Sequence, residues 1–179
     1  MESRVKSLGH PIHQMLIPFP FGLLCTAVIF DIIYLIWGNP TMVVVSYWMV
    51  VGGIIGAVAA APFGLIDWIA IPSNTRAKRI GAFHGIGNVI VLVLFVASWY
   101  LRYTAGGINP YRPSLAALAL SFVGFALAGV TGWLGGELVD RLGVGVDNGA
   151  NLDAPNSLTG PIPRNTRSEA AETKYRHAA

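Results

Sequence analysis

The chain has 179 residues, of which 54% are hydrophobic and only 12% are charged, with a net charge of +3. Soluble domains are about a quarter charged, so this composition, with its mean hydropathy of +0.58, excludes an ordinary soluble domain and indicates a membrane protein. The single cysteine, Cys25, excludes an intrachain disulfide. The sequence has no serine-centred triad, nucleotide-binding loop or nucleic-acid-binding motif, which argues against a hydrolase or a nucleic-acid binder.

Four apolar stretches are long enough to cross a bilayer, which takes about 20 residues of helix. They cover approximately residues 13–37, 43–71, 81–100 and 114–138. The connectors are rich in Gly, Pro and Asn, and short connectors join antiparallel neighbours. The sequence therefore predicts an all-α membrane protein, in which residues 1–142 form an up-down bundle of four transmembrane helices.

Lysine and arginine concentrate on one side of this predicted bundle. Six of them flank the spans there: Arg4, Lys6, Arg76, Lys78, Arg79 and Arg141. The opposite side has only Arg102 and Arg112. Since the side richer in basic residues faces the cytoplasm, we expect both termini to be cytoplasmic.

Residues 143–179 differ in composition from the rest of the chain. They are polar, rich in Asn, Pro, Ser and Ala, and have almost no apolar periodicity. Such a segment buries too little apolar surface to fold alone. We predict an extended C-terminal tail that is either flexible or ordered by a partner protein.

Small residues and prolines indicate how the spans pack. Pro18 and Pro20 predict a kinked or partly unwound start of the first span, because proline removes a backbone hydrogen bond. Residues four apart share a helix face, and two strips of small residues follow this spacing: Gly52, Gly56, Ala60 and Gly64 in the second span, and Gly124, Ala128, Gly132 and Gly136 in the fourth. These strips favour close helix packing, with a flat cofactor lying on one of them as the alternative.

Ionisable side chains at membrane depth are costly and often mark a functional site. Five of them fall at a similar depth on the predicted cytoplasmic side: His10, His13, Asp67, His84 and Glu137. His10 and His13 share a helix face if the helix has begun by Pro11. Imidazole and carboxylate groups bind transition metals, so all five are candidate metal ligands. His13 and His84, from different helices, are also candidate axial ligands of a b-type haem.

Asp31 stands apart from this group. It lies 18 positions after His13, which corresponds to about 27 Å of helix, so we expect it near the opposite face. There we predict a structural carboxylate, hydrogen-bonded to Tyr34 or to a hydroxyl group of another helix.

An ordered series of motifs resembles the bacterial membrane proteins of domain of unknown function 2231. The motifs are Leu8-Gly9-His10-Pro11-Ile12-His13, Phe19-Pro20-Phe21-Gly22, Phe30-Asp31, Pro62-Phe63-Gly64-Leu65-Ile66-Asp67-Trp68, the residues Arg76, Arg79 and His84, and Gly132-Trp133-Leu134-Gly135-Gly136-Glu137-Leu138. They extend over about residues 8–146. The resemblance implies a four-span protein of the bacterial inner membrane. Some family members are fused to c-type cytochrome modules. The resemblance therefore implies an association with redox proteins but defines no activity.

Three functions remain open at this point. The first is a redox-associated membrane subunit that holds haem b or a transition metal at the histidine and carboxylate group. The second is a non-catalytic structural or accessory subunit of a larger membrane complex, in which the same side chains brace the bundle. The third, a small transporter, is less favoured because four spans without internal repeats are few for that task. The expected partners are the lipid bilayer and other membrane-protein subunits, and we predict no catalytic residue.

Overall fold

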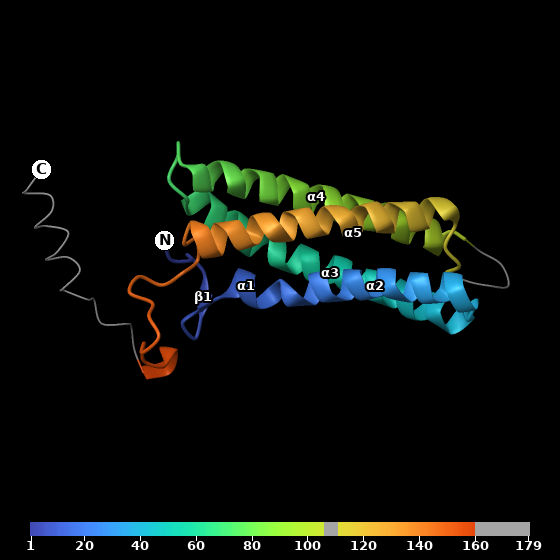
Figure 1. The fold of residues 1–179 in the computed structure, drawn as a ribbon, viewed down its shortest axis with the longest axis horizontal. Coiled ribbons are helices and arrows are strands. Elements are labelled where there is room, and N and C mark those ends of the chain that lie inside the picture. Colours follow the sequence, from blue (N-terminus) through green and yellow to red (C-terminus); the bar gives the residue numbers. More distant parts are fainter. Residues whose placement is uncertain (106–110, 160–179) are drawn as a thin grey trace, which may run out of the picture.

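The computed structural model describes residues 1–105 and 111–159, and these form an up-down bundle of four long helices (Figure 1). The four helices are α2 (Pro18–Trp37), α3 (Pro40–Ala70), α4 (Arg76–Tyr103) and α5 (Leu115–Gly136). Shorter elements flank them: β1 (Lys6–Ser7), β2 (His10–Pro11) and α1 (Ile12–Leu16) before, and the π-helix η1 (Glu137–Arg141) and the 3-10 helix η2 (Ser157–Thr159) after. The four predicted spans are confirmed, since four helices have the length and apolar composition needed to cross a membrane.

The bundle has two different ends (Figure 1). We call the end with the α2–α3 and α4–α5 connections the distal end. The opposite end, which we call the terminal end, carries the N-terminal residues, the α3–α4 connection and the segment after α5.

The starts of the long helices follow from their capping residues. The side chains of Asn39, Thr75 and Ser114 each accept a hydrogen bond from a backbone N–H in the first turn of α3, α4 and α5. Such caps satisfy donors that have no partner inside the helix. At the end of α2, Gly38 has a φ of 65°, a left-handed conformation that glycine adopts without strain and that commonly ends helices.

The first span is interrupted, as its prolines predict. Helix α1 ends at Leu16 and α2 begins at Pro18, with Ile17 between them. His10 and His13 would share a helix face only if the helix had begun by Pro11, and this condition is not met. His10 pairs with Ser7 in the short β1–β2 hairpin, and the helix begins only at Ile12. The hairpin turn at Leu8 and Gly9 has positive φ at both residues, which directs the chain back before it can become helical.

The strips of small residues pack helices together, as predicted. Helix α2 lies mainly against α3, and α4 mainly against α5. A Cβ atom added at Gly52 would lie 3.2 Å from Leu23 Cδ1, and one at Gly56 would lie 3.2 Å from Pro20 Cδ. In the second pair, a Cβ at Gly124 would lie 2.9 Å from Phe95 Cε2. Because apolar helices gain little from leaving lipid, this close van der Waals contact is a main source of their association.

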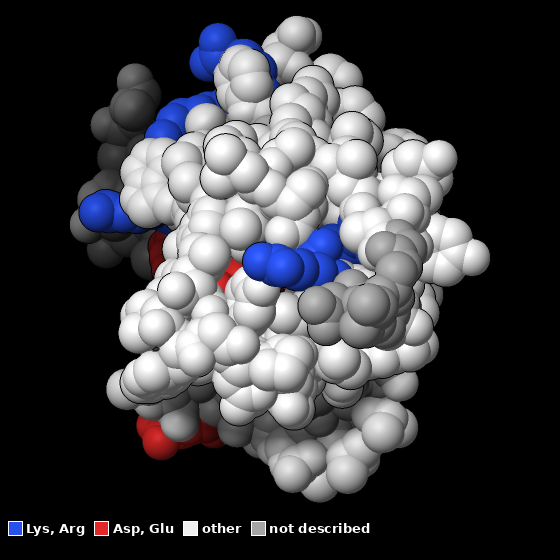
Figure 2. All heavy atoms as spheres, turned by 90° about the vertical axis from the view of Figure 1, so that its right-hand side faces the viewer, with Lys and Arg blue, Asp and Glu red and all other residues white. Residues whose placement is uncertain are grey.

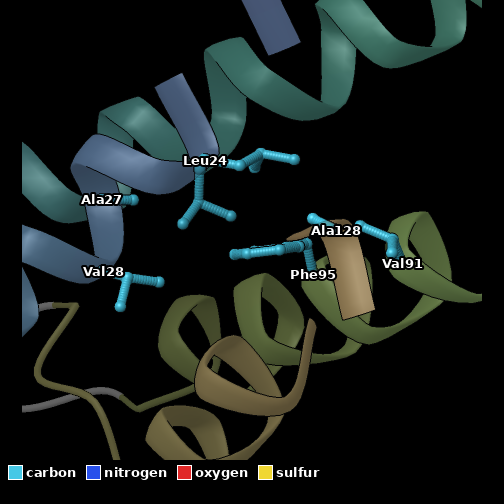
Figure 3. Close-up of a cluster of buried hydrophobic side chains, with 7 residues drawn as sticks. Leu24, Ala27, Val28, Val91, Phe95 and Ala128 are labelled. Atoms are coloured by element: carbon cyan, nitrogen blue, oxygen red, sulfur yellow. The ribbon is translucent and has the colours of Figure 1, made fainter. Parts of the chain in front are cut away.

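An apolar cluster joins the two helix pairs midway along the bundle (Figure 3). It consists of Leu24, Ala27 and Val28 of α2, Val50 of α3, Val91 and Phe95 of α4, and Ala128 of α5. Outward-facing apolar side chains, by contrast, are well exposed: the exposed fraction is 64% for Ile55 and 59% for Val93. Such surfaces are suited to contact with lipid.

Gly53 offers a direct test of the α2–α3 contact. A Cβ atom there would lie 2.5 Å from Leu24 Cδ2 and 3.4 Å from the Leu24 backbone nitrogen. We expect Gly53→Ala to lower the free energy of unfolding in detergent by about 1–2 kcal/mol, because the helices must move apart. Gly129→Ala is the matched control, since nothing lies within 4 Å of that position. Alanine is the better helix former, so the control protein should be as stable as wild type or more so.

The segment after α5 is ordered by the chain itself over its described part. Its backbone and side chains contact the N-terminal residues: Gly145 N–H donates to the Met1 carbonyl oxygen at 2.8 Å, and Asn148 N–H donates to Glu2 Oε1 at 3.1 Å. The rest of the predicted tail, residues 160–179, lies outside the described residues.

Candidate functional site

A buried ion pair lies inside the bundle towards its distal end. Asp31 of α2 and Arg102 of α4 are both 0% exposed. Arg102 Nη1 donates to Asp31 Oδ1 at 2.9 Å, and Arg102 Nη2 donates to Asp31 Oδ2 at 2.6 Å. This two-point arrangement matches the planar guanidinium to the carboxylate and is the strongest geometry for such a pair.

Three serine hydroxyls complete the surroundings of the ion pair. Each accepts a hydrogen bond from one of the Arg102 N–H groups that do not bond to Asp31. Arg102 Nε donates to Ser98 Oγ, Nη1 to Ser46 Oγ and Nη2 to Ser121 Oγ, each at 3.2 Å. Ser46 Oγ donates in turn to Asp31 Oδ1 at 2.6 Å. A guanidinium has five N–H donors, and these bonds occupy them all. All four long helices therefore contribute to one hydrogen-bonded group, which we call the Arg102 network.

Two aromatic residues that follow serines of the Arg102 network in the sequence, Tyr47 and Trp99, form a further contact between helices. Trp99 Nε1 donates to Tyr47 Oη at 3.0 Å, which joins α4 to α3. The ring of Tyr47 stacks on that of Tyr111 with the centroids 4.1 Å apart. Figure 2 shows that the distal end is mostly uncharged, with basic and acidic atoms adjoining near its middle.

The sequence predicted only part of this arrangement. Asp31 is separate from the other ionisable groups and bonds to a hydroxyl, as expected, but the hydroxyl is that of Ser46 and not of Tyr34. Arg102 was expected beside a connector on the distal side and is instead buried. A signal was available: Asp31 and Arg102 each lie close to the distal end of a span, so two opposite charges share one depth. Nothing in the sequence indicates that Ser46, Ser98 and Ser121 face them.

The predicted site residue His13 lies on α1 against α3. Its Nδ1 is 3.0 Å from the Ala60 carbonyl oxygen, and because a carbonyl only accepts, Nδ1 must carry the proton. The imidazole lies over Gly64, where an added Cβ would be 2.6 Å from Cε1 and 2.9 Å from each ring nitrogen. Any larger residue at position 64 would therefore collide with the histidine ring. No described residue hydrogen-bonds to His13 Nε2.

The predicted site residue His84 is bonded within the other helix pair. Its Nδ1 donates to the Thr131 carbonyl oxygen of α5 at 2.8 Å, and its Nε2 lies 3.1 Å from Asn88 Nδ2, one turn along α4. Asn88 Oδ1 accepts from Thr131 Oγ1 at 3.0 Å. Gly135 makes room for the ring, since a Cβ there would lie 3.1 Å from His84 Cε1. Asn88 and Thr131 were not among the predicted site residues.

The remaining predicted site residues lie at the terminal end, each with its own partners. Asp67 accepts from Ser3 Oγ at 2.9 and 2.8 Å and from Arg4 N–H at 2.7 Å. Glu137 pairs with Arg76 at 2.6 Å. His10 Nε2 lies 3.3 Å from Ser157 Oγ.

The fit of a metal or haem to these residues can be judged from their geometry. Among residues 1–105 and 111–159, no three His, Cys, Asp or Glu side chains are grouped closely enough to hold a metal ion. A b-type haem requires only two axial histidines. Both His13 and His84 give Nδ1–H to a carbonyl, which is the usual second-shell bond of a ligating histidine. A haem between them would nevertheless require the Asn88 amide to leave His84 Nε2.

Comparison with known protein families gives a match over most of the chain. The profile of a family described as predicted membrane proteins, DUF2231, matches residues 9–148, which agrees with the motif resemblance over residues 8–146. No curated protein and no solved structure matches the chain. Because the profile covers most of the sequence and the structure has four helices able to cross a membrane, the protein belongs to the DUF2231 family of predicted membrane proteins.

Proposed function

We propose that this protein is a non-catalytic structural or accessory subunit of a larger membrane complex. One observation carries the proposal. In the part of the chain that the structure describes, every buried side-chain nitrogen and oxygen has a hydrogen-bond partner within the protein. Sites that bind a polar ligand commonly leave convergent donors or acceptors for it, whereas a bracing role satisfies them internally.

The distribution of these bonds supports the bracing role. The Arg102 network joins all four long helices, His13 joins α1 to α3, and His84 joins α4 to α5. Hydrogen bonds between helices add to van der Waals packing inside a bilayer. The result is a rigid bundle whose outer surface is apolar and available to lipid or to neighbouring subunits.

We propose that the protein lies in the bacterial inner membrane with both termini in the cytoplasm. The charges support this orientation more strongly than the sequence alone suggested. Arg102 is buried in an ion pair. Among the described residues, Arg112 is therefore the one exposed basic residue at the distal end. The terminal end has six, and basic residues favour the cytoplasmic side.

Site-specific photo-crosslinking in native membranes tests the subunit role. A photoreactive side chain is placed at one exposed position on each of the four long helices: Ile29 on α2, Ile55 on α3, Val93 on α4 and Val130 on α5. We expect stoichiometric adducts with one membrane protein from one face and lipid adducts from the others, because a subunit interface occupies a single patch. Lipid adducts from all four positions, together with a monomeric size in mild detergent, would contradict the proposal.

A second candidate is a redox-associated subunit with a b-type haem or a transition metal near His13 and His84. The specific observation in its favour is the contact of each Nδ1 with a carbonyl oxygen, because a neutral imidazole that donates from Nδ1 keeps the lone pair on Nε2 that a metal needs. Asp67, Glu137 and His10 would then either bind the metal directly or hydrogen-bond to the residues that do. The bound group would supply electron transfer.

Absorption spectroscopy tests this second candidate independently of the first. Protein isolated from its own membranes should show a Soret band, or contain metal in a fixed ratio, and His84→Ala should remove it. Asn88→Leu is the informative companion variant, since it frees His84 Nε2 and should strengthen binding. A colourless and metal-free preparation would exclude this candidate and leave the structural role intact.

A further inference from the structure

Residues 1–11 form a strap across the terminal end of the bundle. The strap includes the β1–β2 hairpin and lies beside the segment that follows α5 (Figure 1). It is held on one side by α3, because Asp67 accepts hydrogen bonds from Ser3 Oγ and Arg4 N–H. Ser3 is buried in this contact. The strap is therefore attached to the helix pair α2–α3 through α3.

On its other side the strap contacts the segment that continues from α5. Lys6 Nζ makes an ion pair with Asp147 and a second one with Glu2, the latter at 2.9 Å. Glu2 Oε1 also accepts from Asn148 N–H at 3.1 Å. Lys6 thus pairs with a residue of the strap and a residue of the segment, and it is the side-chain part of a connection to which Met1 adds main-chain bonds with Gly143 and Gly145.

The connection differs in kind from the one at the distal end. There the two helix pairs are joined by the Arg102 network, which is fully buried. At the terminal end the membrane-embedded histidines bond within their own pair, His13 to Ala60 and His84 to Thr131. The side chains that pair across are half-exposed, with exposed fractions of 24% for Lys6 and 35% for Asp147. Salt screens such exposed charges far more than buried ones.

From these contacts we propose that the strap is an electrostatic latch. While Lys6 is paired with Asp147 and Glu2, the strap keeps α1 and the start of the segment after η1 together. When these ion pairs are weakened, the terminal end loosens while the Arg102 network keeps the distal end closed. Packing of Gln14 of α1 against Gly145 is lost in the loosened form.

Ionic strength is the appropriate means of releasing the latch, and moderate pH change is not. Hydrogen bonding to Lys6 lowers the pKa of Glu2 below its usual range. Hydrogen bonds to Asp147 and Glu2 raise the pKa of Lys6 above its usual range. Both groups therefore stay charged throughout the neutral range, so the pairs persist there unless salt screens them.

Hydrogen exchange of the full chain in lipid nanodiscs tests the latch. In Lys6→Ala, amides of residues 1–11 and 143–148 should exchange about two to five times faster, the range expected for losing exposed ion pairs. Peptides around Arg102 should exchange at the wild-type rate. Arg4→Ala is the matched control, because it removes the same charge from the same strap without an ion pair among the described residues.

Salt dependence completes the test. In the wild-type protein, raising the salt concentration should accelerate exchange in both segments. This acceleration should be absent in Lys6→Ala and smaller in Asp147→Asn, which keeps the ion pair between Lys6 and Glu2. Equal exchange in Lys6→Ala and Arg4→Ala would overturn the latch. So would a salt response in Lys6→Ala as large as that of the wild type.

Discussion

Arg102→Ala is expected to lower the free energy of unfolding by about 3–5 kcal/mol, the usual cost of breaking a buried ion pair by removing one partner. The physical reason is that Asp31 is 0% exposed and would be left with Ser46 Oγ as its remaining donor. Unfolding of the purified protein in mixed micelles, followed by circular dichroism, measures the loss. Asp31→Ala should cost a similar amount, because it leaves the guanidinium without its counter-charge.

Two further variants show whether the pair itself is responsible. Arg112→Ala, an exposed arginine at the same end, should change stability by no more than about 0.5 kcal/mol. The double variant Asp31→Leu with Arg102→Met should recover most of the loss, because apolar residues of similar volume often replace a buried ion pair at little cost. Ser98 Oγ would keep its bond to the Ala117 carbonyl oxygen at 2.7 Å. Equal stability of Arg102→Ala and Arg112→Ala would contradict the buried pair.

Phe95→Ala should destabilise the bundle by about 3 kcal/mol. Phe95 is 0% exposed at the centre of the apolar cluster that joins the two helix pairs (Figure 3). Phenylalanine truncation in a core costs about 3–5 kcal/mol. We expect the lower end of that range, because separated helices in lipid keep the side chain in apolar surroundings and only the packing is lost. The same micelle unfolding experiment measures it.

Two controls separate the loss of packing around Phe95 from the general effect of replacing a phenylalanine on α4. Phe83→Ala, on the same helix but 64% exposed, should cost less than about 0.5 kcal/mol. Gly124→Ala should destabilise the wild type, since its Cβ would lie 2.9 Å from Phe95 Cε2. In the Phe95→Ala protein the same methyl group refills part of the cavity and should stabilise. A Gly124→Ala effect of the same sign in both backgrounds would show that α4 and α5 do not pack as described.

The predicted polar residues show how much of a site can be predicted from the position of each residue along its span. Counting positions placed Asp67, His84 and Glu137 correctly towards one end of the bundle, and Asp31 towards the other. Depth alone does not fix the direction in which a side chain projects around the helix. His84 of α4 bonds to α5 and to Asn88 of its own helix, while His13 of α1 bonds to Ala60 of α3. Whether a metal or haem binds there stays a prediction.

The prediction for the tail shows a different limit. Low hydrophobicity predicted an extended tail with little regular structure, and within residues 143–159 the regular element described is the short helix η2. The low hydrophobicity suggested that any order comes from a partner protein, whereas the described contacts of these residues are with the N-terminal residues of the same chain. Pairing between segments separated by more than 130 residues has no local pattern, so composition does not reveal it.

The sequence by itself determined the four spans, the short connections and the glycine strips. Each of these depends on local composition or on the helical repeat, and both can be read along the chain. Only the tertiary structure decided that Arg102 is buried against Asp31, that three serines complete its hydrogen bonds, and that Lys6 joins the strap to Asp147. The first two depend on how each helix is rotated about its axis and on which helix lies beside it, and packing of the whole bundle sets both. The third joins two non-helical segments from opposite ends of the chain, which only the folded bundle brings together.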